Sequence, residues 1–408
     1  MKVTTAIRVN QVKITIIGAG VQGSTIALFL TQNPEVSQII CSDISLDRAK
    51  RLKDKLKSDK ISPAKADAAN IDELLKVTKG ADVVVNATVP RYNLKIMDAA
   101  LRNGAHYVDL AADAPVKISV LKELELSPKW KDAGLTAVIN QGGPFVMNVL
   151  VRHAADRLDK VDSIRLRFGW KYLTKEKELV QAWEWEPRWS PEVALEEWAP
   201  EPVIFEEGKF KQIPRFSGVE EYTFPDPVGP IILSFIEYEP VFTLPRFIGK
   251  GVRYVDCKIT LDFPVATLIE LGFADDKPVE LKGGIRVVPK DVLLAMVPPP
   301  VEARDKVETG EIDAIGCYLA EVSGEVAGEK TTYTMYRIDR GSDVVRRYGA
   351  VWSDVAIPAS ITATMLAKGE IKTKGVFPPE CLEPKPFLTK LAEKGVVFQE
   401  RVTRKIRL

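Results

Sequence analysis

The sequence predicts an α/β protein in which a doubly wound parallel sheet is followed by a second, α+β domain with a mostly antiparallel sheet. Strand and helix signals alternate through residues 12–140, and strands of alternating polarity dominate after Pro144. The chain has 408 residues, more than a single hydrophobic core serves well. We therefore expect a first domain over residues 1–144, a second over 145–345, and a C-terminal segment, 346–408, that returns to the first.

The first predicted strand, Val12 to Ile17, leads into a glycine-rich turn and then a helix. This order of strand, glycines and helix is typical of a dinucleotide-binding (Rossmann) domain. Gly18 allows the tight turn, Gly20 lets the backbone approach a pyrophosphate, and Gly23 lets the helix lie close to the strand. The helix N-terminus supplies free N–H groups for the phosphates. The predicted cofactor-binding residues of the turn are Gly18, Gly20, Val21, Gln22 and Gly23.

An acidic residue stands where a dinucleotide site needs one. Asp43 follows the second predicted strand, Ser37 to Cys41, about twenty residues after the turn. A carboxylate there accepts hydrogen bonds from the ribose 2′-OH and repels a 2′-phosphate, so we expect NAD rather than NADP. The alternative is a glycine turn in a domain that has lost its ligand.

The rest of the first domain continues the alternation of helix and strand. In order, we expect a helix at Asp47–Lys57, a strand at Ile61–Ala66, a helix at Ile71–Val77, a strand at Asp82–Asn86, a helix at Leu94–Leu101, and strands at His106–Leu110 and Leu135–Ile139. Ligands of such sheets bind beyond the carboxyl ends of the strands. The residues that follow each strand are therefore candidates for the site.

Two of these strand ends suggest further cofactor contacts. We expect Asn86, Ala87, Thr88 and Val89 to pass under the nicotinamide ribose, because the fourth strand end does so in Rossmann enzymes. Asp67 is a candidate for binding the adenine amine, with an ordinary acid at a helix N-terminus as the alternative.

The candidates for catalysis and substrate binding follow the later strands. Asp109 ends a strand and could orient an amine or move a proton, with Asp113 as its competitor. Either could instead cap the segment that begins at Pro115. The predicted substrate-facing residues are Arg91 and Tyr92, after the fourth strand, and Asn148, at the crossing into the second domain.

The second domain shows alternating strands. They are expected at Ser163–Gly169 and Val255–Leu261, and as a hairpin of Cys317–Val326 with Thr331–Ile338. Between Trp183 and Gly229 lies a stretch rich in proline and aromatic residues, which we interpret as either a lid or an oligomer-contact arm. A helix at Pro358–Lys368 is expected to pack on the first domain.

Composition narrows the function classes. The formal net charge is +1, from 57 Lys and Arg against 56 Asp and Glu, which provides no general attraction to nucleic acid or to an anionic membrane. No run approaches a membrane span, and we see no secretory signal. Four scattered cysteines and two histidines make a metal site improbable and fit a reducing cytoplasm.

Several segments resemble the saccharopine dehydrogenase family. They are Val83–Pro90, Ala105–Leu110, Pro358–Gly369 and Gly375–Glu380. Within that family, Trp189-Ser190-Pro191, Phe216-Ser217-Gly218 and Thr243–Gly251 look most like lysine 6-dehydrogenases. Gly169-Trp170-Lys171-Tyr172 stands where saccharopine reductases carry Gly-Gly-Leu-Pro, which counts against saccharopine itself as the substrate.

The resemblance implies an NAD-linked oxidoreductase that acts on a C–N bond of an amino acid, with oxidative deamination of L-lysine at the ε-carbon as the first expectation. It assigns Arg246 to the substrate carboxylate, because Thr243–Arg246 resembles the Thr-Leu-Arg motif of the family with an added proline. Thr243 is expected to assist through its hydroxyl group. The alternatives are a surface arginine and a structural threonine.

Two other functions stay open. One is a reductase that joins an amino acid to a carbonyl compound, with Arg215 or Arg253 as a second carboxylate ligand. The other is a non-catalytic NAD-binding sensor. We expect a homodimer formed through the sheet of the second domain.

Overall fold

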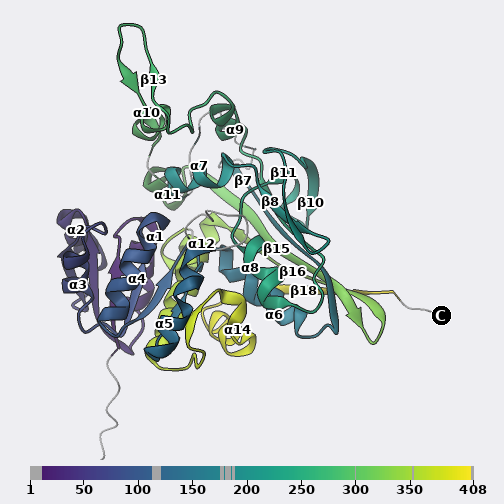
Figure 1. Cartoon of the computed structure of the whole chain (residues 1–408), viewed down its shortest axis with the longest axis horizontal. Coiled ribbons are helices and arrows are strands. Elements are labelled where there is room, and N and C mark those ends of the chain that lie inside the picture. The colour runs from purple at the N-terminus through teal and green to yellow at the C-terminus, as the bar shows by residue number, and fades with distance from the viewer. Residues whose placement is uncertain are drawn as a thin grey trace, which may run out of the picture. The chain divides into compact units, whose positions relative to one another are not determined.

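The computed structural model describes residues 12–112, 121–174, 179, 185, 189–298, 300–351 and 353–405 (Figure 1). The chain divides into two compact units. Unit 1 consists of Met1–Asp113, Leu121–Val146 and Asp354–Leu382. Unit 2 consists of Ala114–Val120, Met147–Ser353 and Glu383–Leu408.

Unit 1 is built on a seven-stranded parallel sheet. Its order is β17-β6-β5-β4-β1-β2-β3. The strands are β1 Val12–Ile17, β2 Val36–Asp43, β3 Ile61–Lys65, β4 Val83–Asn86, β5 His106–Asp109, β6 Thr136–Val138 and β17 Gly375–Phe377. Their near-continuous β-branched and apolar residues fit a sheet that is covered on both faces. The predicted doubly wound sheet is confirmed.

Helices cover both faces of this sheet. Those of unit 1 are α1 Val21–Thr31, α2 Leu46–Leu56, α3 Ile71–Thr78, α4 Asn93–Arg102, α5 Ser127–Asp132 and α13 Ser353–Ala367, with 3-10 turns η1 Pro90–Tyr92, η2 Lys122–Leu126, η3 Pro144–Val146 and η4 Pro379–Cys381. On one face, Val84 and Tyr107 pack with Leu74 of α3, Ile96 of α4 and Trp130 of α5. Alternate strand residues supply the opposite face.

The strand order changes direction between β1 and β4. The chain places β2 and β3 on one side of β1, and it then places β4, β5, β6 and β17 on the other side. The chain leaves β1 and β4 at the same edge, where the Ala87 N–H donates to the Ile17 carbonyl oxygen at 2.8 Å. In open α/β sheets this switch point is the usual ligand site.

Unit 2 contains a nine-stranded mixed sheet. Its main path is β10-β11-β12-β7-β15-β16-β18, and β8 pairs with both β12 and β9. Only β7 and β12 pair in parallel among these strands. The strands are β7 Lys160–Leu173, β8 Val203–Glu206, β9 Lys209–Gln212, β10 Glu220–Phe224, β11 Gly229–Phe235, β12 Tyr254–Thr260, β15 Asp313–Val326, β16 Glu329–Arg340 and β18 Gln399–Arg404. The predicted mostly antiparallel sheet is confirmed.

The predicted hairpin is β15–β16. Val326 pairs with Glu329, so the loop has two residues, Ala327 and Gly328, with φ of 51° and 80°. Positive φ at both positions is the geometry of a tight hairpin turn whose twist matches the strands.

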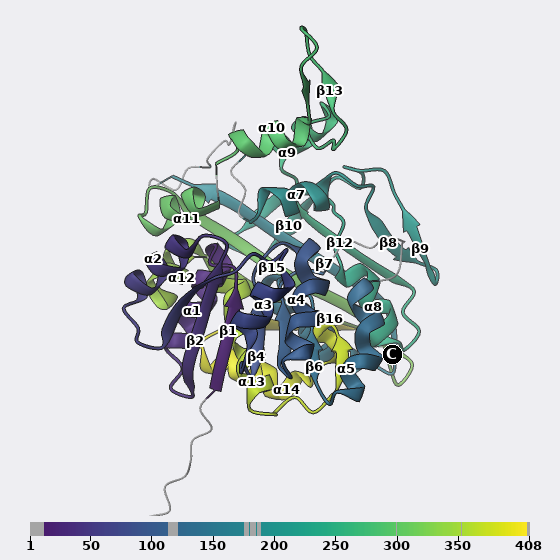
Figure 2. The same cartoon turned by 60° about the vertical axis from the view of Figure 1, so that its left-hand side comes forward.

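The helices of unit 2 are α6 Met147–Ala155, α7 Pro191–Trp198, α8 Pro240–Ile248, α9 Phe263–Glu270, α10 Pro289–Met296, α11 Pro300–Glu308, α12 Gly341–Tyr348 and α14 Pro384–Glu393. A separate two-stranded hairpin, β13 Val279–Glu280 with β14 Arg286–Val287, extends away from the large sheet of this unit next to α9 and α10 (Figure 2).

The structure differs from the sequence-based expectations in two places. The segment expected to return to the first domain divides: Asp354–Leu382 belongs to unit 1, whereas Glu383–Leu408 belongs to unit 2, because β18 pairs with β16. The stretch from Trp183 to Gly229, expected to be irregular, holds α7, β8, β9 and β10, which make up about half of its described part.

One helical stretch is longer and more apolar than expected. By length and composition alone, Gly341–Ala367 could cross a membrane, which corrects the expectation that no run approaches that length. Most of its apolar window, 82%, is buried inside the protein, as in a core helix, so this stretch is weak evidence for a membrane span.

Candidate active site

The glycine turn of unit 1 is shaped by two steric constraints. Gly18 has φ +99°, which L side chains rarely adopt, and an added Cβ would lie 2.7 Å from the Ala87 carbonyl oxygen. A Cβ at Gly23 would lie 1.8 Å from the Gly18 carbonyl oxygen. Glycine is therefore required at both positions by the fold itself. A side chain at Gly18 would collide with the loop after β4, and one at Gly23 would push α1 away from the glycine turn.

Gly20 differs from its neighbours. A Cβ there would meet no atom within 4 Å, so the fold does not exclude a side chain. Gly20 is the N-cap of α1, and no side chain caps the helix. Buried Oε1 of Gln22 has no hydrogen-bond partner. An uncapped helix N-terminus beside open space and an orphaned polar atom fits the pyrophosphate of a dinucleotide.

Asp43 anchors the same turn. Its Oδ2 accepts a hydrogen bond from the Ala19 N–H at 2.9 Å, and its Oδ1 accepts one from the Ser45 N–H at 2.9 Å. The side chain of Arg48, in the first turns of α2, places Nη1 3.4 Å from Oδ1. The carboxylate is thus fixed at the end of β2, beside the glycine turn, where the ribose of a dinucleotide lies in Rossmann domains.

Asn86 organises the end of β4. Its Nδ2 donates to Asn93 Oδ1 at 2.8 Å and to Tyr107 Oη at 3.0 Å. Its Oδ1 accepts from the Thr88 N–H at 2.9 Å and from Thr88 Oγ1 at 2.6 Å. All four hydrogen-bonding positions of the amide are occupied. The side chain therefore positions the backbone of the 86–89 loop, which lies against Gly18.

Asp109 lies at the end of β5, 1% exposed. Its Oδ1 accepts a hydrogen bond from the Asn140 N–H at 2.6 Å. Burial, followed by the charge of Asp109, raises the pKa of Tyr107 well above its ordinary value. A buried carboxyl next to a phenol that stays protonated can hold or pass a proton. Its predicted competitor, Asp113, lies outside the described residues.

The other predicted residues of unit 1 have local contacts. Asp67 Oδ1 accepts from the Ala69 N–H at 2.8 Å, as expected for a residue that turns the chain before α3. Arg91 and Tyr92 follow β4 in η1, where the Arg91 guanidinium lies 5.0 Å from the Tyr92 ring centroid.

In unit 2, the predicted carboxylate ligand lies on α8. Arg246 is exposed and forms no ion pair with any residue in the part of the chain that the structure describes. Thr243, on the same helix, is 1% exposed, and its Oγ1 has no hydrogen-bond partner. Asn148 is buried on α6. An unneutralised guanidinium on a short helix is suited to a carboxylate.

The proposed second carboxylate ligands are engaged at the surface. Arg215 Nε lies 3.7 Å from Glu270 Oε1, and Arg253 pairs with Glu207. Both are exposed ion pairs, which contribute little energy and are easily exchanged.

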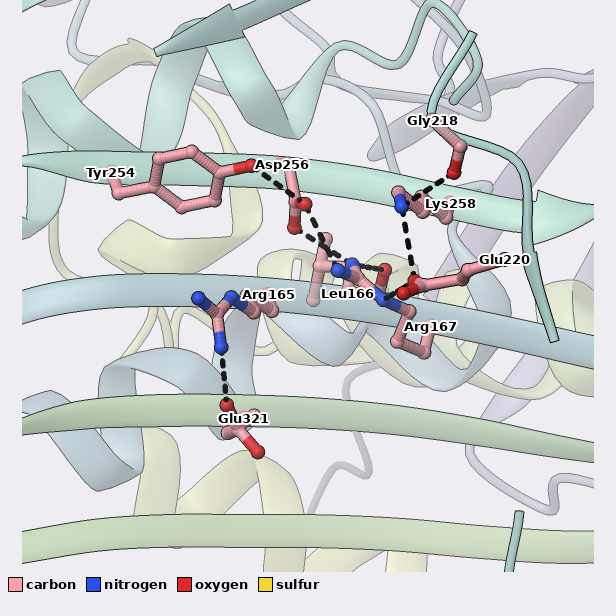
Figure 3. Close-up of polar contacts among 9 residues, drawn as sticks. All are labelled: Arg165, Leu166, Arg167, Gly218, Glu220, Tyr254, Asp256, Lys258 and Glu321. Atoms are coloured by element: carbon pink, nitrogen blue, oxygen red, sulfur yellow. Dashed lines mark hydrogen bonds and ion pairs between the residues drawn. The ribbon is translucent and has the colours of Figure 1, made fainter. Parts of the chain in front are cut away.

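A buried ion network crosses the sheet of unit 2 (Figure 3). Arg167 forms two parallel hydrogen bonds with Asp256, of 2.7 and 2.9 Å. Lys258 Nζ lies 3.0 Å from Glu220 Oε1 and donates to the Gly218 carbonyl oxygen at 2.6 Å. Glu220 Oε1 also lies 3.4 Å from Arg167 Nε, so the two cations share this carboxylate. Both cations are paired within the sheet, and we therefore interpret the network as a structural link between β7, β10 and β12 rather than as a binding site.

His106, Cys41 and Cys317 have the surroundings of structural residues. His106 Nδ1 accepts from the Thr136 N–H at 3.0 Å, as a structural residue does. Burial raises the pKa of the Cys41 and Cys317 thiols to about 12, which removes their nucleophilic form. Among the described residues, no group of three or more His, Cys, Asp or Glu side chains could hold a metal ion.

Sequence reasoning missed three polar residues near these sites: Arg48, Glu197 and Glu239. Arg48 stands five positions after Asp43, and its helix was expected. Glu239 precedes Thr243 and Arg246 by four and seven residues, the spacing of one helix face. That signal was hidden because Pro245, inside the segment, argues against a helix.

Comparison with known proteins relates the whole chain to one group of enzymes. Residues 14–138 match the family model of the saccharopine dehydrogenase NADP binding domain. Residues 145–396 match that of the saccharopine dehydrogenase C-terminal domain.

Two curated relatives are similar over nearly their entire length. Carboxyaminopropylagmatine dehydrogenase of Synechocystis sp. is 26% identical over 96% of this chain and 98% of its own. Carboxynorspermidine synthase of Vibrio alginolyticus is 26% identical over 93% and 94%. Apo saccharopine dehydrogenase (L-Glu forming) from Saccharomyces cerevisiae has the same fold, with a TM-score of 0.70 at 17% identity over 96% of this chain and 100% of that one.

Proposed function

Because the chain belongs to the saccharopine dehydrogenase family, and so is an NAD(P)-dependent oxidoreductase acting on C–N bonds, we propose that it joins a primary amine to a carbonyl compound by reduction. The product is a carboxylated secondary amine. This proposal is the alternative that the sequence left open. It is supported by one observation: both relatives described above match nearly the whole chain and are named for carboxylated polyamines.

The reaction balances as a condensation and a reduction. The amine nitrogen and the carbonyl carbon form an imine and release water. A hydride and a proton then convert the C=N bond into a C–N single bond. When bound, the reduced dinucleotide supplies the hydride. The protein must hold the imine carbon near it, exclude water and manage the proton.

Each of these tasks has a candidate residue. The glycine turn and Asp43 would hold the dinucleotide. Arg246 would bind the carboxylate of the substrate through two parallel hydrogen bonds. Asp109, buried beside Tyr107, would take up or deliver the proton at the nitrogen.

Lysine oxidation at the ε-carbon is the second candidate. In that reaction lysine, water and the oxidised dinucleotide give the semialdehyde, ammonium, a proton and the reduced dinucleotide. The segment Thr243–Gly251, which looks most like lysine 6-dehydrogenases, favours it. Arg246 and Asp109 would have the same roles.

The two reactions are separated by one set of assays. NADH and NADPH oxidation would be followed with agmatine or 1,3-diaminopropane, each paired with an amino-acid semialdehyde. NAD reduction would be followed with L-lysine at alkaline pH. Turnover that needs both amine and aldehyde supports the condensation. Turnover with lysine alone replaces it with oxidative deamination, and no turnover in either direction favours the NAD-binding sensor.

We also propose a cytoplasmic homodimer that associates through the sheet of unit 2. The mass in solution, measured by light scattering, tests the dimer. A charge reversal at exposed Arg165 on that sheet, Arg165→Glu, would shift the mass toward the monomer if the sheet forms the interface.

A further inference from the structure

Asn140 stands at the carboxyl end of β6, in the row of the sheet after Asp109. Val108 of β5 pairs with Val138 of β6, and Asn140 comes two positions later. Two backbone N–H groups join the chain here to β5. The Asn140 N–H donates to Asp109 Oδ1 at 2.6 Å, and the Gln141 N–H donates to the Asp109 carbonyl oxygen at 2.9 Å. The place of Asn140 is therefore fixed against β5.

The backbone of Asn140 has a conformation that glycine adopts more easily. Its φ is 61°, in the left-handed region. Asparagine tolerates this region better than most residues with a side chain, but only glycine enters it without a steric cost. The backbone therefore gives no reason for a side chain at this position.

The side-chain amide of Asn140 is buried, and its donor has no partner. The residue is 4% exposed, and Nδ2 makes no hydrogen bond to any residue in the described part of the chain. Buried amide donors are almost always hydrogen-bonded, because an unpaired donor has lost its water without a replacement. The protein without a ligand thus bears two costs at one residue, a left-handed backbone and an unpaired donor. Such residues gather at sites that a ligand completes.

The next residue carries a buried amide that is held inside the same unit. Gln141 Oε1 accepts a hydrogen bond from Thr362 Oγ1 of α13 at 3.1 Å. Its Nε2 also lacks a partner among the described residues, but the bond to Thr362 ties the side chain to the helix. No hydrogen bond holds the Asn140 donor in this way, so Asn140 is the better candidate for a ligand.

The order of the strands indicates which half of a dinucleotide lies at β6. Asp43, where the adenosine ribose lies in Rossmann domains, ends β2 on one side of the glycine turn, whereas β4, β5 and β6 lie on the other side. A dinucleotide binds across this switch point, so its nicotinamide half lies over β4 to β6. Since β6 is the third strand from β1, about 14 Å away at the usual strand spacing, the ring end of that half comes closest to Asn140.

The chemistry of the nicotinamide ring matches an unpaired amide donor. The ring carries a carboxamide group, which has a carbonyl oxygen that accepts and an NH2 group that donates. The asparagine side chain has the same two kinds of group. A carbonyl oxygen is the acceptor that the buried Nδ2 lacks.

We propose that Asn140 binds the carboxamide of the nicotinamide ring through its side-chain Nδ2 and thereby holds the ring beside Asp109. This inference goes beyond the proposed function, because it concerns the dinucleotide and holds for the condensation and for lysine oxidation alike. Both reactions need a hydride at the ring and a proton nearby. The side chain of Asn140 would bind the ring, while its backbone N–H binds Asp109, the candidate for managing the proton.

The test compares NAD with ADP-ribose, which has the same adenosine and pyrophosphate but no nicotinamide. The affinity of the full chain for each is measured by calorimetry for the wild type and for Asn140→Gly. Glycine removes the side chain and suits the left-handed backbone. Lys57→Gly is the matched control, because Lys57 is exposed and has a φ of 46° at the end of α2.

We expect Asn140→Gly to weaken NAD binding by about three- to tenfold, as the loss of one hydrogen bond between neutral groups does, and to leave ADP-ribose binding unchanged. The midpoint of its denaturant unfolding without ligand should be no lower than that of the wild type, because the substitution removes an unpaired donor. Lys57→Gly should change neither affinity.

Equal weakening of both ligands would mean that Asn140 acts on the part that they share, and unchanged NAD binding would mean that the carboxamide lies elsewhere. Either result overturns the proposal. An Asn140→Gly variant that is less stable than the wild type without ligand also overturns it, because the fold would then need the side chain. None of these measurements uses turnover, so a failure of the proposed condensation is distinguishable from a failure of this inference.

Discussion

The Oδ2 atom of Asp43 accepts a hydrogen bond of 2.9 Å from the backbone N–H of Ala19, which joins the acidic end of β2 to the middle of the glycine turn. One carboxylate therefore has two consequences. It fixes the turn against β2, and it sets the charge at the place where the adenine ribose lies in Rossmann domains. Arg48, 3.4 Å away and largely exposed, offsets part of that charge.

Asp43 should determine the choice between NAD and NADP. Asp43→Ala removes the acceptor for the ribose 2′-OH and the repulsion of a 2′-phosphate, and it leaves Arg48 free to pair with that phosphate. We expect the ratio of kcat/KM for NADP to that for NAD to rise by about tenfold or more. Steady-state kinetics with both cofactors measure it, and Asp47→Ala, an exposed acid of α2, is the control. An unchanged ratio would remove Asp43 from the ribose site.

Two glycines of the turn should respond differently to the same substitution. In Gly20→Ala the new Cβ meets no protein atom, so the loss of stability should stay below about 1 kcal/mol. The methyl group would, however, occupy the space next to the helix N-terminus, and NAD binding should weaken by about tenfold or more. In Gly23→Ala the Cβ would collide with the Gly18 carbonyl oxygen, and stability should fall by roughly 2 kcal/mol.

Denaturant unfolding measures the stability of the Gly20→Ala and Gly23→Ala variants, and titration with NAD measures their affinity for the dinucleotide. If Gly20→Ala bound NAD normally, the pyrophosphate would have to lie elsewhere. If Gly23→Ala were as stable as the wild type, the close approach of α1 to β1 would be wrong.

Arg246 should matter for the substrate and not for the cofactor. Arg246→Ala removes an exposed guanidinium that has no ion pair among the described residues, so folding should be unaffected. Loss of two charge-assisted hydrogen bonds should raise KM for a carboxylated substrate by about tenfold or more, with NADH binding unchanged. Arg346→Ala, at an exposed ion pair with Asp343 in the same unit, is the control. Equal loss of substrate and cofactor binding, or loss of neither, rejects the assignment.

The parallel sheet could be predicted from the sequence because each of the motifs that indicate it lies within a short segment. The glycine turn, Asp43 and the run Val83-Val84-Val85 each define a strand end without reference to distant residues. The edge strands β17 and β18 were missed, since their three and six residues gain their partners only in the folded chain. Helix α8 was missed because Pro245 lies in its interior, and the alignment of Glu239 with Thr243 and Arg246 was missed with it.

The network at the end of β4 shows the same limit. Asn86 was expected to approach the cofactor because of its position after the strand. That role stays a prediction. What the sequence did not predict is that its side chain binds Asn93, Tyr107 and Thr88, which come from α4, β5 and the loop after β4. Sequence position identifies the end of a strand, but only the packing of neighbouring strands determines which polar groups satisfy one another there.

Glu237, which follows β11, should make the stability of the protein depend on pH. Burial raises its pKa from 4.5 to about 7, because the apolar surroundings penalise the charged form. The native state then binds a proton more tightly than the unfolded state does. The contribution of Glu237 to the stability of the protein is therefore greatest below about pH 4.5. This contribution is lost as the pH rises from about 4.5 to about 7.

Replacing this carboxyl group by an amide should remove that dependence. Glu237→Gln keeps an oxygen to accept the Val203 N–H and cannot ionise. We expect equal stability of variant and wild type near pH 4, and a variant that is more stable at pH 8. The difference should stay below about 3 kcal/mol, since the side chain retains some access to water. Denaturant unfolding at the two pH values measures it, with Glu201→Gln as the control. A variant less stable than the wild type at pH 8 would mean that the native state stabilises the Glu237 carboxylate. The pKa of Glu237 would then be lowered in the native state and not raised.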